Sequence, residues 1–322
     1  MTRTEWILAV AGLTLTAACG RTDRPAAGAD SAAAAAGDSS AAAASGPSRV
    51  EGFEAPESVK YDPDLDVWYV ANINGTPVGK DGNGYLSRLR SDGSVDSLKW
   101  IAGGVNGVKL DAPKGMALQG DTLWVADITS VRGFNRRTGA AVASIAVKGS
   151  KFLNDIAVGP DGLYATDTGF EGSAKGIEHT GPDRIYRIAP DHSVSVALES
   201  DSLTGPNGIA WDAAGSRFIV VPFAGNVIRA WAPGSKTTTA LGTTKGQLDG
   251  VELLGQNRLL VTSWADSSLF VFENGTVTPV ATGLPSAADI GLDTKRQRVA
   301  VPLLLENRVE FRALPAAGTA QP

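Results

Sequence analysis

The chain is poor in the residues that build disulfides and most transition-metal centres. Its 322 residues include a single Cys and two His. One Cys allows no intramolecular disulfide and no thiolate zinc site, and two His argue against a multi-histidine centre. Any bound metal is therefore expected to be a hard cation that is held by oxygen ligands.

Excess positive charge is also lacking. The chain has 29 Lys and Arg against 34 Asp and Glu, a net charge of −5, which argues against a nucleic-acid-binding protein. Aromatic residues make up only 7%, yet 43% of residues are hydrophobic, enough to bury a sizeable core. The 38 Gly and 17 Pro indicate a chain that is rich in turns.

The N-terminus carries a short apolar segment. Trp6–Ala18 follows the positive Arg3 and is too short to span a bilayer, which needs about 20 residues, so residues 1–18 are interpreted as a secretory signal. Cys19 comes directly after Leu15–Ala18, and this resembles the lipobox of bacterial lipoproteins, although Thr16 stands where Leu is usual. The alternative is an ordinary signal peptide with an incidental Cys. Lipidation of Cys19 would place the protein in the bacterial cell envelope, as a periplasmic or outer-membrane lipoprotein.

A small-residue segment separates this signal from the rest of the chain. Residues 20–48 contain 12 Ala and 5 Ser but no apolar side chain larger than Ala. Such a segment cannot bury enough surface to offset its ordering entropy. We therefore expect a lipidated Cys and disordered linker over 19–48, a folded domain over 49–313 and a flexible tail over 314–322.

Six related units fill the folded region. Each begins with a polar or small residue followed by an apolar pair, a tight turn and a strongly apolar strand. These first residues, called the anchors below, are Glu57, Lys114, Asn154, Asn207, Asp249 and Ala288. Their spacings of 39 to 57 residues, with several short strands per unit, predict an all-β, six-bladed β-propeller with four-stranded blades. An all-β sandwich is the alternative, but it does not account for six copies.

The strand count predicts how the ring closes. Fourth strands are expected in five units, at Val95–Trp100, Ala141–Val147, Ser193–Glu199, Thr237–Leu241 and Thr276–Ala281. The sequence after Arg312 has no strand pattern. The missing strand is therefore expected from Ser48–Phe53, which would place both ends of the domain in the last blade and remove open sheet edges.

The anchors are expected to converge at one mouth of the central channel, because the first strand of a propeller blade lines that channel. Glu57, Asn154, Asn207 and Asp249 carry side-chain oxygens. Two carboxylates and two amides suit Ca²⁺ or another divalent cation, with water completing six to eight ligands. The alternative for any one of these positions is a turn cap or a left-handed backbone conformation.

This pattern resembles the senescence-marker-protein/gluconolactonase (regucalcin-like) family over residues 49–313. The resemblance is carried by the sequences APESV around Glu57, LNDIAVGPDG from Leu153, GPNGIAWD from Gly205 and LDGVEL from Leu248. It implies that Glu57, Asn207 and Asp249 are direct metal ligands and that Asn154 is a ligand or a substrate contact. It also implies hydrolysis of lactones or phosphoesters, with Asp249 as the catalytic carboxylate that activates water or attacks directly.

Two anchors depart from that family pattern. Lys114 brings a cation that could repel the metal or pair with Glu57, and Ala288 offers no polar group, although Asp289 lies beside it. If each first hairpin pairs without interruption, Asp127 faces Lys114 and neutralises it.

The same pairing would place Asp167 opposite Asn154 and add a carboxylate near the mouth. Lys114, Asp127, Asp167 and Trp264 are accordingly candidate substrate contacts, with Trp264 either stacking on a ring or serving in packing. The long loops Asn74–Gly84 and Asp167–Asp183 are expected to overhang this face. His179 and His192 are interpreted as surface residues.

The sequence thus predicts a monomeric, envelope-anchored hydrolase of lactones or related esters that depends on Ca²⁺ or another divalent cation. Its expected partners are a small-molecule substrate and, through the lipid anchor only, a membrane; no nucleic acid is expected. The alternative is a non-catalytic propeller that binds a small ligand or a protein partner. A third possibility is an assembly scaffold that resembles strictosidine-synthase-like propellers. Fold alone cannot choose among these functions.

Overall fold

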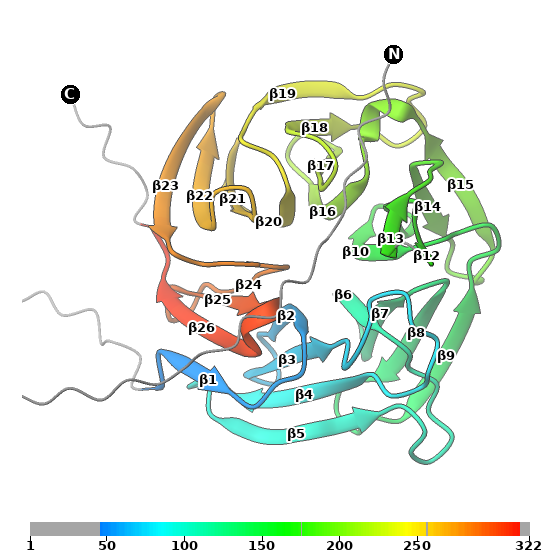
Figure 1. Cartoon of the computed structure of the whole chain (residues 1–322), viewed down its shortest axis with the longest axis vertical. Helices are drawn as coiled ribbons and strands as arrows, with labels where there is room; N and C mark the ends of the chain where they lie inside the picture. The colour runs from blue at the N-terminus through cyan, green and yellow to red at the C-terminus, as the bar shows by residue number, and fades with distance from the viewer. Residues whose placement is uncertain (1–45, 175, 256, 316–322) are drawn as a thin grey trace, which may run out of the picture.

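The computed structural model describes residues 46–174, 176–255 and 257–315. In this part of the chain, six four-stranded antiparallel sheets form a ring around a central channel (Figure 1). The six-bladed β-propeller predicted from the repeats is therefore confirmed. The expected signal segment, Cys19, the linker up to residue 45 and residues 316–322 lie outside the described residues. No helix in the described residues is long and apolar enough to cross a membrane.

Each blade runs from an inner strand at the channel to an outer strand at the rim. The strands of blade 1 are β2 (Pro56–Asp62), β3 (Val67–Asn72), β4 (Tyr85–Arg90) and β5 (Val95–Ala102). Those of blade 2 are β6 (Pro113–Gln119), β7 (Thr122–Asp127), β8 (Ser130–Asn135) and β9 (Ala141–Ala146). Those of blade 3 are β10 (Leu153–Gly159), β11 (Gly162–Asp167), β14 (Arg184–Ile188) and β15 (Val194–Glu199).

The second half of the ring repeats this order. The strands of blade 4 are β16 (Pro206–Asp212), β17 (Arg217–Pro222), β18 (Val227–Trp231) and β19 (Thr239–Thr243). Those of blade 5 are β20 (Leu248–Gly255), β21 (Arg258–Ser263), β22 (Ser268–Glu273) and β23 (Thr276–Thr282). Those of blade 6 are β24 (Gly291–Asp293), β25 (Arg298–Leu303), β26 (Arg308–Ala313) and β1 (Arg49–Glu51). Two short 3-10 helices, η1 (Asp201–Leu203) and η2 (Leu304–Glu306), lie in connections.

The core lies between neighbouring blades, because each sheet packs both faces against another sheet. Second strands such as Val67–Asn72 are rich in β-branched and aromatic residues and are almost fully buried. Between blades 3 and 4, the ring of Tyr164 lies 4.5 Å from that of Phe218, which stacks on Trp231 at 5.7 Å. Outer strands such as β9 are mostly exposed, so only their inner faces add to the core.

The ring is closed by a strand from the start of the domain, as the strand count predicted. β1 pairs with β26 in an antiparallel register that sets Val50 opposite Val309. The amide of Phe311 also donates to the carbonyl of Ser48 at 2.8 Å. Both ends of the domain therefore lie in blade 6.

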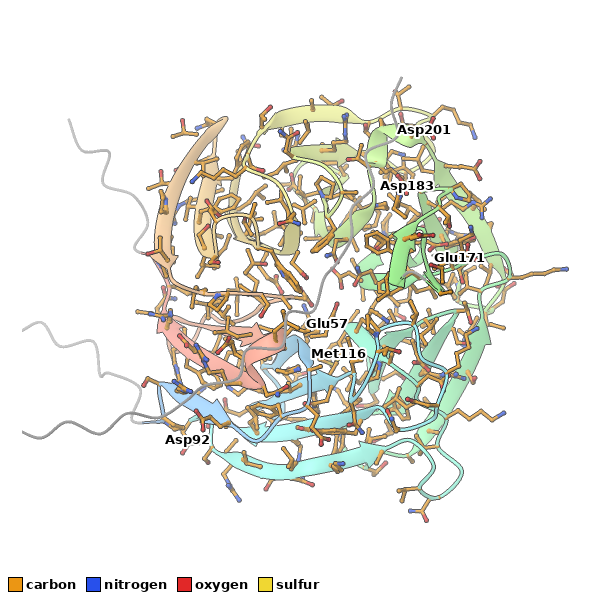
Figure 2. All side chains as sticks on the ribbon, viewed as in Figure 1. Glu57, Asp92, Met116, Glu171, Asp183 and Asp201 are labelled. Atoms are coloured by element: carbon orange, nitrogen blue, oxygen red, sulfur yellow. The ribbon has the colours of Figure 1, made fainter. Side chains whose placement is uncertain are left out.

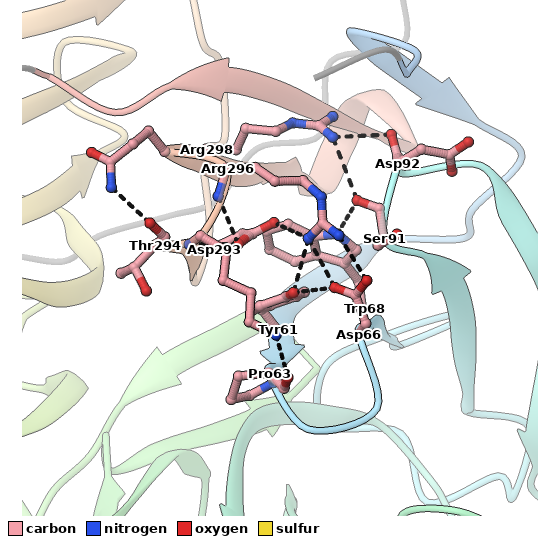
Figure 3. Close-up of polar contacts among 12 residues, drawn as sticks. Tyr61, Pro63, Asp66, Trp68, Ser91, Asp92, Asp293, Thr294, Arg296 and Arg298 are labelled. Atoms are coloured by element: carbon pink, nitrogen blue, oxygen red, sulfur yellow. Dashed lines mark hydrogen bonds and ion pairs between the residues drawn. The ribbon is translucent and has the colours of Figure 1, made fainter. Parts of the chain in front are cut away.

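A second set of contacts joins blade 6 to blade 1, at the turns that follow their inner strands (Figure 3). Arg296, in the turn between β24 and β25, pairs with Asp66 at 2.7 Å and with Asp293 at 2.8 Å. It also donates to the hydroxyl of Tyr61 at 3.0 Å. Arg298 donates to the carbonyl of Asp92 at 3.1 Å. One guanidinium thus connects a turn of the last blade to a turn of the first.

A β-bulge interrupts the first hairpin of blades 1 to 5 at the anchor. In blade 2, Pro113 faces Asp127 while Met116 faces Val125, so Lys114 and Gly115 together oppose one residue. Blade 3 shows the same shift between Leu153 and Ile156. The predicted pairing of Lys114 with Asp127 is therefore wrong, because the bulge inserts one residue and sets Asp127 opposite Pro113.

The predicted pairing of Asn154 with Asp167 fails for the same reason, since Asp167 faces Leu153. A bulge re-aims the side chains that it contains. Its recurrence at the second residue of β2, β6, β10, β16 and β20 explains why a one-to-one register does not hold at the mouth of the channel.

An extra hairpin rises from blade 3 between β11 and β14. It consists of β12 (Phe170–Ser173) and β13 (Gly176–His179). A Cβ atom at Gly172 would lie 3.0 Å from Val78, which belongs to the long loop of blade 1. The two long loops predicted at this face therefore approach each other.

Candidate metal centre at the channel mouth

The anchors lie in the bulges at the start of the inner strands, and these strands contact one another around the channel. Figure 2 shows Glu57 at the inner end of blade 1, near the middle of the ring. All six anchors are buried, with exposed fractions between 0% for Ala288 and 5% for Glu57 and Asn154. The predicted convergence of the anchors on one end of the channel agrees with this arrangement.

Three anchor oxygens are buried without a hydrogen-bond partner. They are Glu57 Oε2 in blade 1, Asn154 Oδ1 in blade 3 and Asp249 Oδ1 in blade 5. Leaving a buried acceptor unsatisfied costs about 1–3 kcal/mol, and more for a charged group. Three such oxygens from three blades fit the donor set of a hard divalent cation.

The side chains of the two anchor amides, Asn154 and Asn207, are oriented by hydrogen bonds that their Nδ2 atoms donate. Asn154 Nδ2 donates to Thr168 Oγ1 at 3.0 Å, and Thr168 in turn donates to the carbonyl of Pro206 at 2.8 Å. Asn207 Nδ2 lies 3.4 Å from the carbonyl of Leu248. With the amide nitrogen of Asn154 bound to blade 3, its oxygen is left for another partner.

The two anchor carboxylates destabilise each other's charged forms. Burial raises the pKa of Glu57 well above its ordinary value, and the charges of Asp249 and Asp289 raise it further. Burial also raises the pKa of Asp249 well above its ordinary value, followed by the charge of Asp289. Polar groups of the nearby Trp264 and Asn207 act in the opposite direction on the pKa of Asp249. A dication would relieve this repulsion.

Lys114 enters the ring from blade 2. Its ammonium donates to the carbonyl of Ala112 at 2.9 Å and lies 4.3 Å from the centre of the Phe152 ring. Burial lowers the pKa of Lys114 to about 8, although the charges of Glu57 and Asp127 act to raise it. Lys114 is therefore held by its own blade and by blade 3, while it influences Glu57 through space.

Asp127 and Asp167 hold the backbone that leads into the inner strands. Asp127 accepts from the amides of Asp111 and Ala112 and pairs with Arg132 at 2.9 Å. Asp167 accepts from the amide of Phe152 at 2.8 Å. Both carboxylates thus bind backbone amides of residues that shortly precede an anchor. Their contact with a substrate stays a prediction.

Two carboxylates of the channel were not assigned from the sequence. Asp155, one residue after an anchor, accepts from the amides of Ile156 at 2.7 Å and Ile209 at 2.8 Å. Asp289 accepts from Ser58 Oγ at 2.6 Å. Both are 5% exposed, and burial raises the pKa of each, that of Asp289 to about 6. Their shared place after an anchor was the only sequence signal.

The other end of the channel holds a cavity of about 440 Å³. Apolar residues such as Met116, Trp211 and Leu253 line it together with Lys60, which pairs with Glu252 at 2.8 Å. It extends from Asp155 and Asp289, each directly after an anchor, toward the far ends of the inner strands.

The two His side chains are exposed, as predicted. His179 Nε2 lies 2.6 Å from Asp183 Oδ1, and this contact raises the pKa of His179 above its ordinary value. His192 packs edge-on against Trp124, with ring centres 5.7 Å apart. Among the described residues no three His, Cys, Asp or Glu side chains gather closely enough to hold a metal. The candidate centre therefore depends on its two amides.

The sequence model of the family described as SMP-30/gluconolactonase/LRE-like region matches residues 83–278, more than half of the chain. The chain belongs to this family. The match includes Asn154, Asn207 and Asp249, whereas Glu57 lies before it and is placed in the same ring by the fold. Members of this family are generally metal-dependent, which agrees with the donor set described above.

Solved structures confirm the family fold at low sequence identity. A protein assigned by name to the gluconolactonases has a TM-score of 0.59 and 15% identity, covering 83% of this chain and 92% of that one. A gluconolactonase from Xanthomonas campestris has a TM-score of 0.59 and 17% identity, covering 82% and 88%. A chain from a nidogen/laminin complex has a TM-score of 0.55 and 17% identity, covering 76% of this chain and 82% of that one.

At these identities the similarities establish the fold alone. A comparison with curated proteins gives no significant match. The function of this SMP-30/gluconolactonase-family chain must therefore be argued from its own site.

Proposed function

We propose that this family member is a metal-dependent hydrolase of lactones or related esters, with Ca²⁺ as the preferred cation. The observation that carries this proposal is the set of three buried, unpartnered oxygens on Glu57, Asn154 and Asp249. Asn207 would complete the protein ligands. Family membership and the gluconolactonase neighbours support a lactonase-type reaction.

The bound cation would polarise the substrate carbonyl, which favours attack by water. Asp249 would accept a proton from that water at its carboxylate, because burial raises its pKa and so increases its affinity for a proton. The water oxygen bonds to the carbonyl carbon, the ring C–O bond breaks, and Asp249 returns the proton to the leaving oxygen. The product is a hydroxy acid.

Lys114 would bind rather than activate the substrate. Its ammonium already donates to Ala112 and lies over Phe152, so it is held in one place beside Glu57. A fixed positive charge that acts on Glu57 offsets part of the negative charge of the site without filling a ligand position. We propose that it orients the developing carboxylate of the product.

The proposal is tested by following thermal unfolding and lactone hydrolysis during a Ca²⁺ titration. We expect Ca²⁺ to raise the Tm by several degrees, since a ligand of the folded state stabilises it by mass action. Chelator should reverse the shift and abolish hydrolysis. Asp249→Asn should weaken Ca²⁺ binding at least tenfold and lower kcat at least 100-fold.

The matched control is Glu273→Gln, which removes an exposed carboxylate from the same blade. It should bind Ca²⁺ and turn over lactones like the unaltered protein. Absence of any metal-dependent shift in Tm would contradict the proposal at its starting point.

A non-catalytic binding role is the second candidate. Lys114 favours it, because a buried ammonium beside Glu57 competes with the charge of a bound dication. One of the structurally similar chains was solved in a nidogen/laminin complex, so a fold of this kind occurs in a protein that binds another protein. Under this alternative, Asp249→Ala weakens binding of a ligand or protein partner, and no lactone is hydrolysed at any metal concentration.

We also propose that the protein is anchored in the cell envelope through a lipid on Cys19. The support is the sequence alone, where Cys19 directly follows the apolar segment Trp6–Ala18. Cys19→Ser should move the protein from the membrane fraction to the soluble fraction, as measured by fractionation and immunoblotting. Unchanged membrane retention would contradict lipid anchoring.

A further inference from the structure

One position at the mouth is apolar in almost every blade. It is the residue directly after the second strand, which lies at the same end of the blade as the anchor because the first two strands are antiparallel. In blades 1 to 6 this residue is Ile73, Ile128, Thr168, Phe223, Trp264 and Leu304. Five of these six residues are apolar, so the fold places an apolar ring beside the oxygen set.

Aromatic rings form a continuous arc over blades 3 to 5. Phe170, from the extra hairpin, packs edge-on against Phe152 at 5.6 Å and Phe223 at 6.1 Å between ring centres. Phe223 packs against Trp264 at 5.4 Å.

Both ends of this arc reach an anchor. Phe152 lies under the ammonium of Lys114 at 4.3 Å. The amide of Trp264 donates to the carbonyl of Gln247, two residues before the anchor Asp249, at 2.9 Å. The arc therefore borders the candidate metal centre. Phe170, Phe223 and Trp264 are only partly buried.

The opposite side of the mouth is apolar as well. Ile73, Ala112 and Ile128 form one buried cluster, and Ala55 and Leu304 pack against it. These residues come from blades 6, 1 and 2, so the arc and this cluster together border the anchors on both sides.

Apart from the three unpartnered anchor oxygens and Trp264 Nε1, several polar side chains at this mouth are already engaged by the protein. Asp127 and Asp167 accept backbone amides and Asp127 also pairs with Arg132. Thr168 binds Asn154 and the carbonyl of Pro206. Asp183 lies against His179 and accepts from the amide of Gly205 at 2.8 Å.

The hydroxyls of a polyhydroxylated lactone would find few free partners here. A site disfavours polar groups that it buries and leaves unpaired. Apolar substituents are instead stabilised in proportion to the apolar surface that they bury.

We infer that the mouth selects lactones or esters whose non-reacting part is an alkyl or aryl group, rather than polyhydroxylated sugar lactones. This inference rests on the proposed function for its chemistry, but the geometry that carries it is the apolar arc and cluster. The reaction is the same addition of water across the acyl C–O bond. The apolar group lies against Phe223 and Trp264 and takes no part in bond making.

The test compares lactones that share one ring. δ-Decalactone and δ-valerolactone have the same six-membered ring and differ by a pentyl chain, whereas D-glucono-δ-lactone carries hydroxyl groups. With Ca²⁺ present, we expect the KM for δ-decalactone to be at least tenfold below that for δ-valerolactone. D-Glucono-δ-lactone should have the lowest kcat/KM of the three.

Two variants locate the effect. Phe223→Ala should reduce the KM ratio between δ-valerolactone and δ-decalactone at least threefold. Phe223→Leu keeps an apolar side chain and should retain most of the ratio. Trp211→Phe changes an aromatic residue at the other end of the channel and should leave the ratio unchanged. Thermal unfolding of each variant verifies that it is folded.

Binding of two lactams separates this inference from the proposed function. The lactams 2-piperidone and 6-pentyl-2-piperidone resist hydrolysis, and their Kd values can be measured by calorimetry in the presence of Ca²⁺. Tighter binding of the pentyl lactam with no lactone turnover overturns the hydrolase but supports the apolar mouth. Turnover with equal KM values, or with preference for D-glucono-δ-lactone, overturns the apolar mouth and leaves the hydrolase. Neither turnover nor a difference between the lactams overturns both.

Discussion

At the scale of single residues, the channel is dominated by buried carboxylates. Glu57, Asp155, Asp249 and Asp289 are all at least nine-tenths buried, and burial is the leading cause of the raised pKa of each. Lys114 compensates only part of this charge, because burial lowers its own pKa. Protons and divalent cations therefore compete for the same site.

The first prediction concerns Asp289 in the metal-free protein. Because its pKa is about 6 in the folded state and 3.8 ordinarily, the folded state binds its proton more tightly. The resulting stability is present below about pH 4 and is lost as the pH rises through about 6, amounting to at most about 3 kcal/mol. Asp289→Asn should flatten the pH dependence of the unfolding free energy between pH 4 and 7.

Urea unfolding in the presence of chelator measures this effect. Asp201→Asn, which alters an exposed carboxylate in η1, serves as the control and should keep the original pH dependence. A pH profile of Asp289→Asn that matches the unaltered protein would show that Asp289 titrates normally in the fold.

At the same scale, the sequence could identify the anchors but not their surroundings. Glu57, Asn154 and Asp249 recur at one repeat position, and recurrence is visible in a sequence. The burial of Asp155 and Asp289 depends on how six blades pack around one axis, which no local pattern contains. Phe170 also escaped prediction, because the hairpin that brings it to Phe152 is an insertion in one blade only.

At the scale of secondary-structure elements, the bulge in the first hairpin determines how the anchors are placed. It places two residues opposite one in each first hairpin and turns the anchor toward the channel. The register predicted from the turns holds below the bulge, where Met116 faces Val125, and fails above it. A bulge leaves no clear sequence pattern at Pro113-Lys114-Gly115, so this failure could not be foreseen.

The second prediction tests the bulge of blade 4 through Gly208. A Cβ atom there would lie 2.3 Å from the carbonyl oxygen of Asp249 and 3.1 Å from the amide nitrogen of Val251, so the backbone of blade 5 must move. Gly208→Ala should lower the unfolding free energy by about 1–3 kcal/mol. It should also weaken Ca²⁺ binding, because Asn207 and Asp249 shift apart.

Urea unfolding and calorimetry with Ca²⁺ measure the two effects. Thr239→Ala, at an exposed position in β19 of the same blade, should change neither. A Gly208→Ala protein with unaltered stability would mean that neighbouring inner strands separate without cost.

At the scale of the whole molecule, closure depends on a three-residue strand. β1 contributes one buried side chain, Val50, which is 8% exposed and joins a cluster with Phe53 and Phe311. The ion pair of Arg296 with Asp66, called the latch here, adds a second link between blades 6 and 1, at the turns that follow their inner strands. The first and last blades are thus joined at two separate places.

The third prediction concerns Val50→Asp. Burying a carboxylate among Phe53 and Phe311 should lower the unfolding free energy by about 3 kcal/mol and release β1 from β26. The free edge of β26 should then promote association, which light scattering can detect. Glu51→Gln changes an exposed neighbour in β1 and should leave both stability and light scattering unchanged. A stable, non-associating Val50→Asp protein would show that β1 is dispensable.

The whole-molecule features were the most predictable part of the fold. Six units with five fourth strands required closure by Ser48–Phe53, and β1 supplies it. The count worked because each strand has its own apolar pattern and its own turn. Contacts between blades, such as the latch from Arg296 to Asp66, depend on distant turns and were not predictable in this way.

The pairing of Arg49 with Glu310 also sets the order of events during synthesis of the chain. These two residues are about 260 positions apart, and such distant contacts form late. β1 leaves the ribosome first and stays without its partner until β26 has been translated. Any nascent or interrupted chain that lacks β26 therefore exposes an unpaired strand at each end of an incomplete ring, which is the state most open to aggregation and proteolysis.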